Sequence, residues 1–241
     1  MLEAGKDESE HKISSVNLST GLPGGEKCNL FCSYCTYGET LGKCERNENV
    51  LEILQYCGEK LDIKHLDYAC GEITISPHRY EIIKLWKDKG WNGRLLTNGV
   101  VFVNEICDLI CDGSVVLNIS LDAGNGETFS KIKGVDCFEK VVGNIEKYAQ
   151  TRQIELKYII LDGINNDDEN IDGFSEIAKR VNAHVMISRD NRIMNRPLTE
   201  SEFSAISQLV DNCISAGLGY TLTMGYMNKD FDRLERAGLL I

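Results

Sequence analysis

Residues 27–35 read KCNLFCSYC, and the three cysteines of this stretch are Cys28, Cys32 and Cys35. Their C-x3-C-x2-C spacing offers three thiolates to a cluster of four irons and leaves the fourth iron without a protein ligand. A cluster that only transfers electrons normally has every iron ligated by cysteine. The spacing therefore indicates an iron–sulfur cluster whose open iron binds a small molecule and takes part in chemistry.

Zinc is the alternative occupant of these cysteines. A structural zinc site needs four ligands, usually supplied as two pairs, and the triplet has no evident fourth partner. The nearest candidates along the chain are His11 and Cys44. A noncatalytic zinc or iron–sulfur module therefore stands as the second interpretation of the motif.

The triplet, together with Tyr34 directly before the third cysteine, resembles the radical S-adenosylmethionine (SAM) enzymes. In that family SAM binds the open iron through its amino and carboxylate groups. The reduced [4Fe-4S] cluster cleaves SAM to methionine and a 5'-deoxyadenosyl radical, which takes a hydrogen atom from the substrate. The resemblance implies an enzyme with two cofactors, SAM and a [4Fe-4S] cluster held by Cys28, Cys32 and Cys35, and it places Tyr34 in the cofactor site.

The composition indicates one soluble globular domain. The chain has 241 residues, of which 42% are hydrophobic, enough to bury a sizeable core. Its net charge of -11 argues against nucleic-acid and membrane partners, since both require a cationic face. The sequence contains no apolar run of about 18–20 residues and begins with a charged stretch rather than a signal peptide. We expect a cytoplasmic protein with a flexible tail over residues 1–12 and a core domain over residues 13–241.

The other cysteines have no metal-ligand spacing. In a chain of this length, outside a small secreted scaffold, such residues are more often reduced and buried than joined in disulfides. Only Cys213 follows Cys137, so the C-terminal part lacks the cysteines for a second cluster. The residues concerned are Cys57, Cys70, Cys107, Cys111, Cys137 and Cys213.

Short β-branched runs alternate with longer amphipathic runs, which predicts a parallel sheet with crossover helices. The expected strands are residues 13–18, 65–69, 94–97, 115–120, 154–161, 184–188 and 220–223. The expected helices are residues 48–59, 77–89, 104–111, 138–150, 171–181 and 200–216. Six or seven βα units are too few for a closed barrel of eight. The predicted fold is α/β, a partial (β/α)6-like open TIM barrel, which is also what the radical SAM resemblance implies.

Ligands of such barrels collect at the C-terminal ends of the strands. After the second expected strand, Cys70-Gly71-Glu72 looks like the family's glycine-rich segment that ends in glutamate, with Cys70 in place of one glycine. The resemblance implies that the backbone of Gly71 and the carboxylate of Glu72 meet the amino group of SAM. A turn with a solvated carboxylate is the structural alternative.

The third and fourth expected strands also end in polar residues. Asn98 is placed like the family's polar contact to the bound nucleoside, although Asn-Gly is also a common turn. Period-two alternation puts Asn118, Ser120 and Asp122 on one face of the fourth strand. In the radical SAM cores that this stretch resembles, Ser120 and Asp122 would face the ribose or the substrate.

Two basic residues compete for the carboxylate of SAM. Lys157 lies in register with Ile159 and Leu161, so its ammonium can point into the barrel, although a lysine at the start of a strand often extends to solvent. Arg189 follows the sixth expected strand, and its planar guanidinium suits bidentate binding of a carboxylate. We expect at least one of the two to be needed.

The sequence names neither the substrate nor the net reaction. The resemblance implies an electron donor of the flavodoxin or ferredoxin type and a small-molecule, peptide or protein substrate. An activase that places a glycyl radical on a partner enzyme is an alternative within the same family.

Overall fold

The fold is a single sheet of parallel strands covered by helices. The computed structural model describes residues 13–18, 28–35, 50–223 and 227–240. Seven strands pair in the order in which they occur in the chain, and each neighbouring pair is parallel. They are β1 (Ser15–Leu18), β2 (His65–Tyr68), β3 (Asn92–Thr97), β4 (Val115–Ser120), β5 (Glu155–Ile160), β6 (His184–Arg189) and β7 (Tyr220–Leu222).

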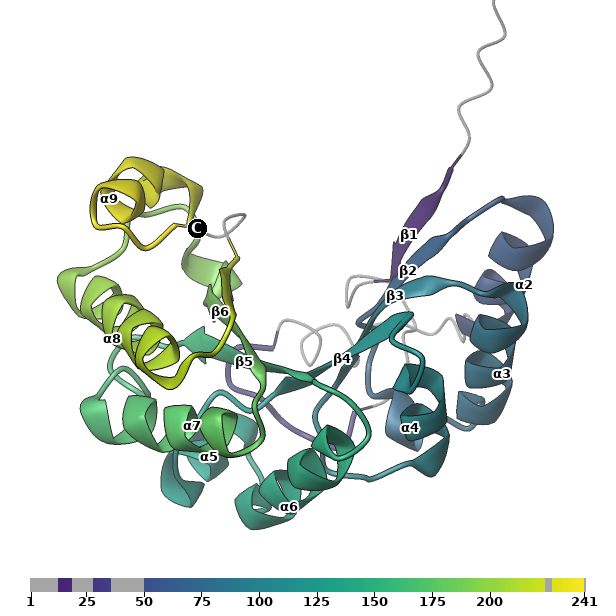
Figure 1. Ribbon diagram of the computed structural model, residues 1–241, viewed down its shortest axis with the longest axis horizontal. Helices are drawn as coiled ribbons and strands as arrows, with labels where there is room; N and C mark the ends of the chain where they lie inside the picture. Colours follow the sequence, from purple (N-terminus) through teal and green to yellow (C-terminus); the bar gives the residue numbers. More distant parts are fainter. Residues whose placement is uncertain (1–12, 19–27, 36–49, 224–226, 241) are drawn as a thin grey trace, which may run out of the picture.

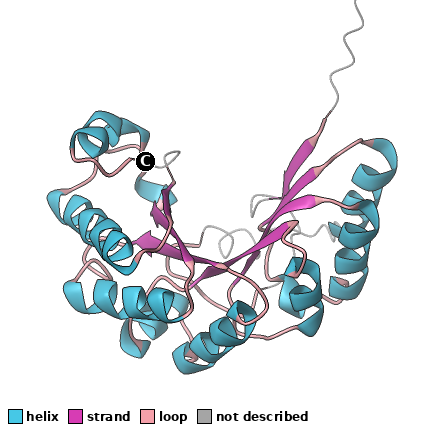
Figure 2. Cartoon of the chain, in the orientation of Figure 1, coloured by secondary structure: helices cyan, strands magenta, loops and turns pink. Residues whose placement is uncertain are grey.

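Helices form the connections, because parallel neighbours require a crossover. The α-helices are α2 (Val50–Lys60), α3 (Arg79–Lys89), α4 (Asn104–Ile110), α5 (Gly126–Lys133), α6 (Phe138–Ala149), α7 (Asp168–Arg180), α8 (Glu200–Ala216) and α9 (Phe231–Arg236). The short 3-10 helices are η1 (Ile73–Ile75), η2 (Asn191–Ile193) and η4 (Asn228–Asp230). The sheet curves, and the helices cover its convex side (Figures 1 and 2).

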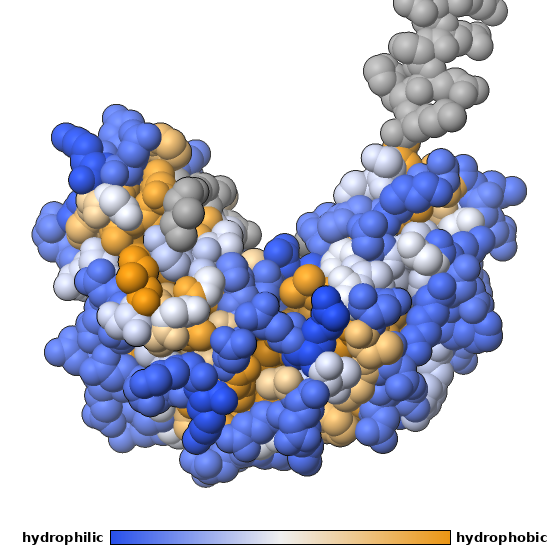
Figure 3. Space-filling view, in the orientation of Figure 1, coloured by the Kyte–Doolittle hydropathy of each residue, from blue (hydrophilic) through white to orange (hydrophobic). Residues whose placement is uncertain are grey.

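The sheet is an open barrel. Strands β1 and β7 form its two edges, since within the described part of the chain each pairs with one neighbour. This confirms the predicted partial barrel, with seven strands. Hydrophilic residues cover most of the outer, helical side of the molecule (Figure 3). Among the described residues, no helix is both long enough and apolar enough to cross a membrane.

Strand β5 shows how the two faces of the sheet differ. Leu156, Tyr158 and Ile160 are fully buried, and the ring of Tyr158 lies edge-on to Phe174 of α7 with a centroid distance of 4.7 Å. These residues face the helices, and burial of each such side chain stabilises the fold by about 1.5–3 kcal/mol. Lys157 alternates with them and therefore belongs to the concave face, where it is only partly buried.

Three helices differ most from the prediction. Helices α5 and α9 lie outside the expected helical ranges; the side chain of Asn125 caps α5 by accepting a hydrogen bond from the Thr128 amide at 2.9 Å. Helix α7 begins three residues earlier than expected, because Asp167 caps it through the Asn170 amide at 3.0 Å. The predicted tail over residues 1–12 lies outside the described residues, as do His11 and Cys44.

Candidate functional site

Residues 28–35, here called the cysteine loop, are docked on the C-terminal end of α5. The Phe31 amide donates to the Lys133 carbonyl at 2.9 Å, and the Ser33 amide donates to the Ile132 carbonyl at 2.8 Å. The last carbonyls of a helix have no partner within the helix. The cysteine loop satisfies two of them, so the backbone on both sides of Cys32 is fixed to α5.

The close approach of the loop depends on Gly134. This residue ends α5 with a φ of 73°, and a Cβ added to it would lie 2.9 Å from the Cβ of Phe31 and 3.1 Å from its carbonyl oxygen. A left-handed conformation costs a residue with a Cβ about 1–2 kcal/mol. Glycine is therefore required here on two grounds, the backbone conformation and the space taken by the loop.

Gly134→Ala is accordingly expected to lower the free energy of unfolding by about 1–2 kcal/mol and to reduce the iron bound after reconstitution. Chemical denaturation and iron analysis measure the two effects. The matched control is Gly143→Ala, since Gly143 lies inside α6 with open space around it. Alanine in a helix interior is favoured by about 0.5–1 kcal/mol. Equal behaviour of the two variants would contradict the role of Gly134.

The three thiols lie close enough to influence one another electrostatically. Burial raises the pKa of Cys28, and Cys35 raises it further. Burial raises the pKa of Cys32 to about 11; Lys133 acts to lower it, and Asp122, Cys28 and Cys35 act to raise it. Uncompensated thiolates are thus unfavourable in the loop, and a bound cation would remove that cost by accepting them as ligands.

The donor set fits an iron–sulfur cluster better than a single ion. Among the described residues, no three His, Cys, Asp or Glu side chains converge as they would around one metal ion. In a [4Fe-4S] cluster each cysteine binds a different iron. Cys28, Cys32 and Cys35 would hold three of the four irons, as their spacing predicts.

Beneath the loop lies a buried polar cluster formed by Tyr34, Ser120, Asp122 and Lys133. Asp122 and Lys133 are 0% and 1% exposed, and the Lys133 ammonium lies 2.5 Å from Oδ2 of Asp122. The same oxygen accepts hydrogen bonds from the Tyr34 hydroxyl at 2.7 Å and the Ser120 hydroxyl at 2.6 Å. Lys133 also donates to the Tyr34 hydroxyl at 2.9 Å. The cysteine loop is thereby joined to the end of β4 and to α5.

Asp122 is held as a carboxylate by these contacts. Burial acts to raise the pKa of Asp122, but the Lys133 ammonium and the hydrogen bonds from Ser120 and Tyr34 outweigh it, so the pKa is lowered. The residue has a φ of 61°, in the left-handed region that is uncommon for a residue other than glycine. The Ile159 amide donates to its Oδ1 at 2.7 Å, and the Asn165 side chain donates to its carbonyl at 2.8 Å.

This arrangement predicts a specific pH dependence of stability. A carboxyl whose pKa is lower in the folded state stabilises the protein above its unfolded pKa of about 3.9 and loses that contribution as pH falls through the folded pKa. Because Asp122→Asn breaks a buried ion pair, it is expected to cost about 3–5 kcal/mol at pH 7. The difference should stay constant down to about pH 4 and shrink below it. Denaturation of the apoprotein across pH measures this; a difference that persists undiminished in acid would contradict it.

The predicted ligands of the SAM amino group, Gly71 and Glu72, follow β2, and Glu72 contacts the end of β3. Glu72 is 1% exposed, and its Oε1 accepts from the Thr97 hydroxyl at 2.7 Å and from the hydroxyl and amide of Thr74 at 2.7 and 3.1 Å. Its Oε2 accepts from the Asn98 amide at 2.6 Å. Burial raises the pKa of Glu72, and these hydrogen bonds oppose the rise. Gly71 precedes it with a φ of 56°, which turns the backbone there.

Asn98 connects Glu72 to the cysteine loop. Its side-chain amide donates to Oδ1 of Asn29 at 2.7 Å and to Sγ of Cys28 at 3.6 Å. The resemblance placed Asn98 against a nucleoside, whereas its side chain contacts the loop in this structure. Glu72 and Asn98 therefore form a second support of the cysteine loop, opposite the one at α5, and their contacts to SAM stay predictions.

Lys157 and Arg189 have different surroundings. Lys157 pairs in register with Ser120 and Met186, and its ammonium has no hydrogen-bond partner within the described part of the chain. Burial lowers its pKa. Arg189 is 1% exposed, and its guanidinium donates to both Glu202 oxygens at 3.2 and 3.3 Å. Breaking a buried ion pair is costly, so Lys157 is the better placed of the two for the carboxylate of SAM.

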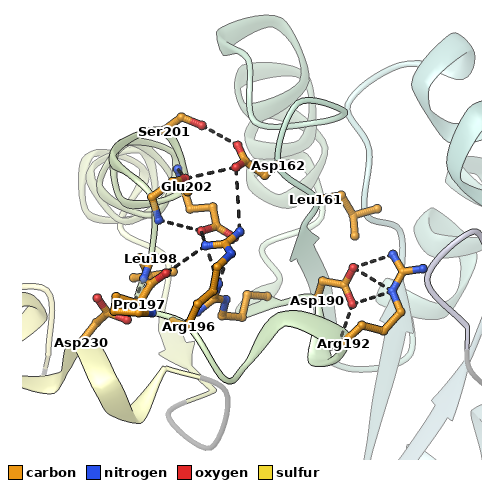
Figure 4. A network of polar contacts seen from close by, with 12 residues as sticks. Leu161, Asp162, Asp190, Arg192, Arg196, Pro197, Leu198, Ser201, Glu202 and Asp230 are labelled. Atoms are coloured by element: carbon orange, nitrogen blue, oxygen red, sulfur yellow. Dashed lines mark hydrogen bonds and ion pairs between the residues drawn. The ribbon is translucent and has the colours of Figure 1, made fainter.

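The segment that follows β6 forms a third contact with the cysteine loop. Arg196 donates to Glu202, whose capping box with Thr199 begins α8, and Asp162 lies beside them (Figure 4). Closer to the end of β6, Arg192 pairs with Asp190 and donates to the Ser33 carbonyl at 2.7 Å. The sequence did not indicate either Lys133 or Arg192 as part of the site.

Comparisons with known proteins agree with this geometry. The family model of the Radical SAM superfamily matches residues 22–175. A probable GTP 3',8-cyclase of Pyrococcus abyssi is 30% identical over 178 residues, which are 71% of this chain and 56% of that protein. A GTP 3',8-cyclase of Desulforamulus reducens is 27% identical over 172 residues, which are 66% of this chain and 51% of that protein. The chain thus spans about half the length of these relatives.

A solved structure shows the same fold at low identity. The structure of Streptococcus suis SuiB bound to S-adenosylmethionine has a TM-score of 0.66 and 9% identity, and covers 88% of this chain and 50% of that chain. The family model accounts for well over half of the 241 residues and includes the cysteine loop and strands β2 to β5. The chain therefore belongs to the radical SAM superfamily, whose enzymes use a [4Fe-4S] cluster and SAM.

Proposed function

We propose that this protein cleaves SAM reductively and uses the resulting 5'-deoxyadenosyl radical to take a hydrogen atom from a substrate. The observation that carries the proposal is the position of Cys28, Cys32 and Cys35 within one short loop that is held at the C-terminal ends of parallel strands. When bound, the cluster supplies the electron that cleaves SAM, and the protein supplies binding, orientation and exclusion of competing reactions.

The residues around the loop divide these tasks. Lys157 lies on the concave face next to Ser120, its ammonium has no partner among the described residues, and it is the proposed partner of the SAM carboxylate. The proposed partners of the SAM amino group are the Gly71 backbone and the Glu72 carboxylate. Among the described residues, Asn98 alone donates to Oε2 of Glu72, and a carboxylate oxygen can accept more than one hydrogen bond. The proposed electron donor is a small carrier of the flavodoxin or ferredoxin type.

The first test is anaerobic reconstitution followed by dithionite, SAM and quantification of 5'-deoxyadenosine by mass spectrometry. The control is the variant with alanine at Cys28, Cys32 and Cys35. Product from the wild type alone supports the proposal. A loaded cluster that yields no product from bound SAM contradicts it, and a preparation that binds zinc instead of iron favours the noncatalytic module.

Substrates are tested in a second stage, with deuterium incorporation into 5'-deoxyadenosine as the readout. GTP is the first compound to supply, because the relative that is 30% identical over 178 residues is named a probable GTP 3',8-cyclase. Deuterium from labelled GTP would support the same substrate here. An activase would instead consume SAM in proportion to the radical sites on a protein partner, whereas an enzyme of small molecules would turn over many equivalents.

A further inference from the structure

The cysteine loop packs against a buried ion pair, Lys133 and Asp122. Lys133 and Asp122 are 1% and 0% exposed. Removing both charges from water costs several kcal/mol per ion, and an apolar pair of similar volume would often be equally stable or more so. Stability alone therefore gives little reason to place a lysine and an aspartate at these positions.

Both charges of the pair contact the cysteine loop at Tyr34. The Lys133 ammonium reaches the Tyr34 hydroxyl at 2.9 Å and lies 5.2 Å from the centre of the Tyr34 ring. The Lys133 carbonyl accepts the Phe31 amide, so the same residue contacts the loop on both sides of Cys32. Asp122 accepts from the same Tyr34 hydroxyl at 2.7 Å, and it also accepts from the Ser120 hydroxyl and the Ile159 amide.

We propose that Lys133 is a positioning residue that holds the cysteine loop on α5 and β4 and also favours reduction of the cluster through its buried positive charge. The inference rests on the proposed function, since it requires a cluster on Cys28, Cys32 and Cys35. A reduced cluster carries one more negative charge than an oxidised one, so a cation fixed nearby stabilises the reduced form. Net charge and hydrogen bonding around the sulfurs are known determinants of cluster potentials.

The Lys133 charge can influence the cluster because it is buried. Charges exposed to solvent are screened by water and salt, whereas buried charges are screened much less. Lys131, two residues earlier on the same helix, is exposed and carries the same charge. It therefore supplies a matched control for the loss of one positive charge in the last turns of α5.

The test is a redox titration of the reconstituted holoprotein, with the reduced cluster measured by electron paramagnetic resonance and iron counted per chain. The variants are Lys133→Met, Lys133→Arg, the double variant Asp122→Asn with Lys133→Met, and Lys131→Met. At the wild-type midpoint potential, the ratio of reduced to oxidised cluster should fall about tenfold in Lys133→Met, equivalent to about 59 mV for a one-electron couple. The double variant should also lie below the wild type, while Lys133→Arg and Lys131→Met stay near it.

Each outcome decides the matter. A wild type that forms no cluster refutes the proposed function itself. A wild type with a cluster, but with Lys133→Met within twofold of its ratio, overturns only the inference about Lys133. An equal fall in Lys131→Met overturns it as well, because any positive charge would then suffice. If Lys133→Met does not bind iron, the decision falls to Lys133→Arg. Iron bound by Lys133→Arg supports the inference, and loss of iron in this variant as well overturns it.

Discussion

Replacing Cys32 with alanine is expected to abolish the cluster, with bound iron falling from about four per chain to background. The visible absorbance and the production of 5'-deoxyadenosine should disappear with it. Cys32 is the central ligand of the triplet, and the amides on both sides of it are fixed to α5, which prevents the loop from offering another group in its place. The remaining two thiols cannot hold a cluster whose fourth iron already lacks a protein ligand.

The protein itself should stay folded in this variant. Cys32 is only partly buried, and a small change at such a position usually alters the free energy of unfolding by about 1 kcal/mol or less. Circular dichroism and denaturation of the apoprotein check this. The matched control is Cys107→Ala, a partly buried cysteine of α4 outside the loop. Unchanged absorbance in Cys32→Ala, or loss of iron in Cys107→Ala, would show that the ligands are assigned wrongly.

The fold was predictable because local patterns determine it. Runs such as Val115–Ser120 and Glu155–Ile160 are rich in β-branched residues, and the amphipathic runs between them leave a parallel sheet as the simplest solution. Helix α5 escaped prediction because its sequence, GETFSKIK, begins with glycine and is mostly polar. Its cap at Asn125 and its contact with the cysteine loop stabilise it, and the loop is far away in the sequence.

The candidate site was predictable only where one short segment contains all the residues of a ligand set. The spacing of the three cysteines is a local signal. The pairing of Lys133 with Asp122 depends on the unpredicted helix α5, and the pairing of Arg189 with Glu202 depends on the course of a loop. A polar residue at a strand end can face a ligand or a buried partner, and the local sequence does not distinguish the two cases.

Glu72→Ala is expected to destabilise the apoprotein by about 3 kcal/mol, because the Glu72 carboxylate satisfies several buried donors. Each buried donor left without a partner costs about 1–3 kcal/mol, although such costs are not additive. The two hydroxyls of Thr74 and Thr97 can turn to other acceptors, whereas the Thr74 and Asn98 amides are fixed in the backbone. Loss of the acceptor for these two amides should therefore dominate.

The effect should reach the cysteine loop through Asn98. Its side chain contacts Asn29 and Cys28, so freeing the backbone at Asn98 should slow cluster assembly as well as weaken SAM binding. Glu72→Gln retains one acceptor oxygen and should lose less stability than Glu72→Ala. Denaturation of the apoprotein and titration of the loaded protein with SAM separate the two roles. Full stability with weakened SAM binding would make Glu72 a ligand alone, whereas lost stability with unchanged SAM affinity in the protein that still folds would make it a support of the loop alone.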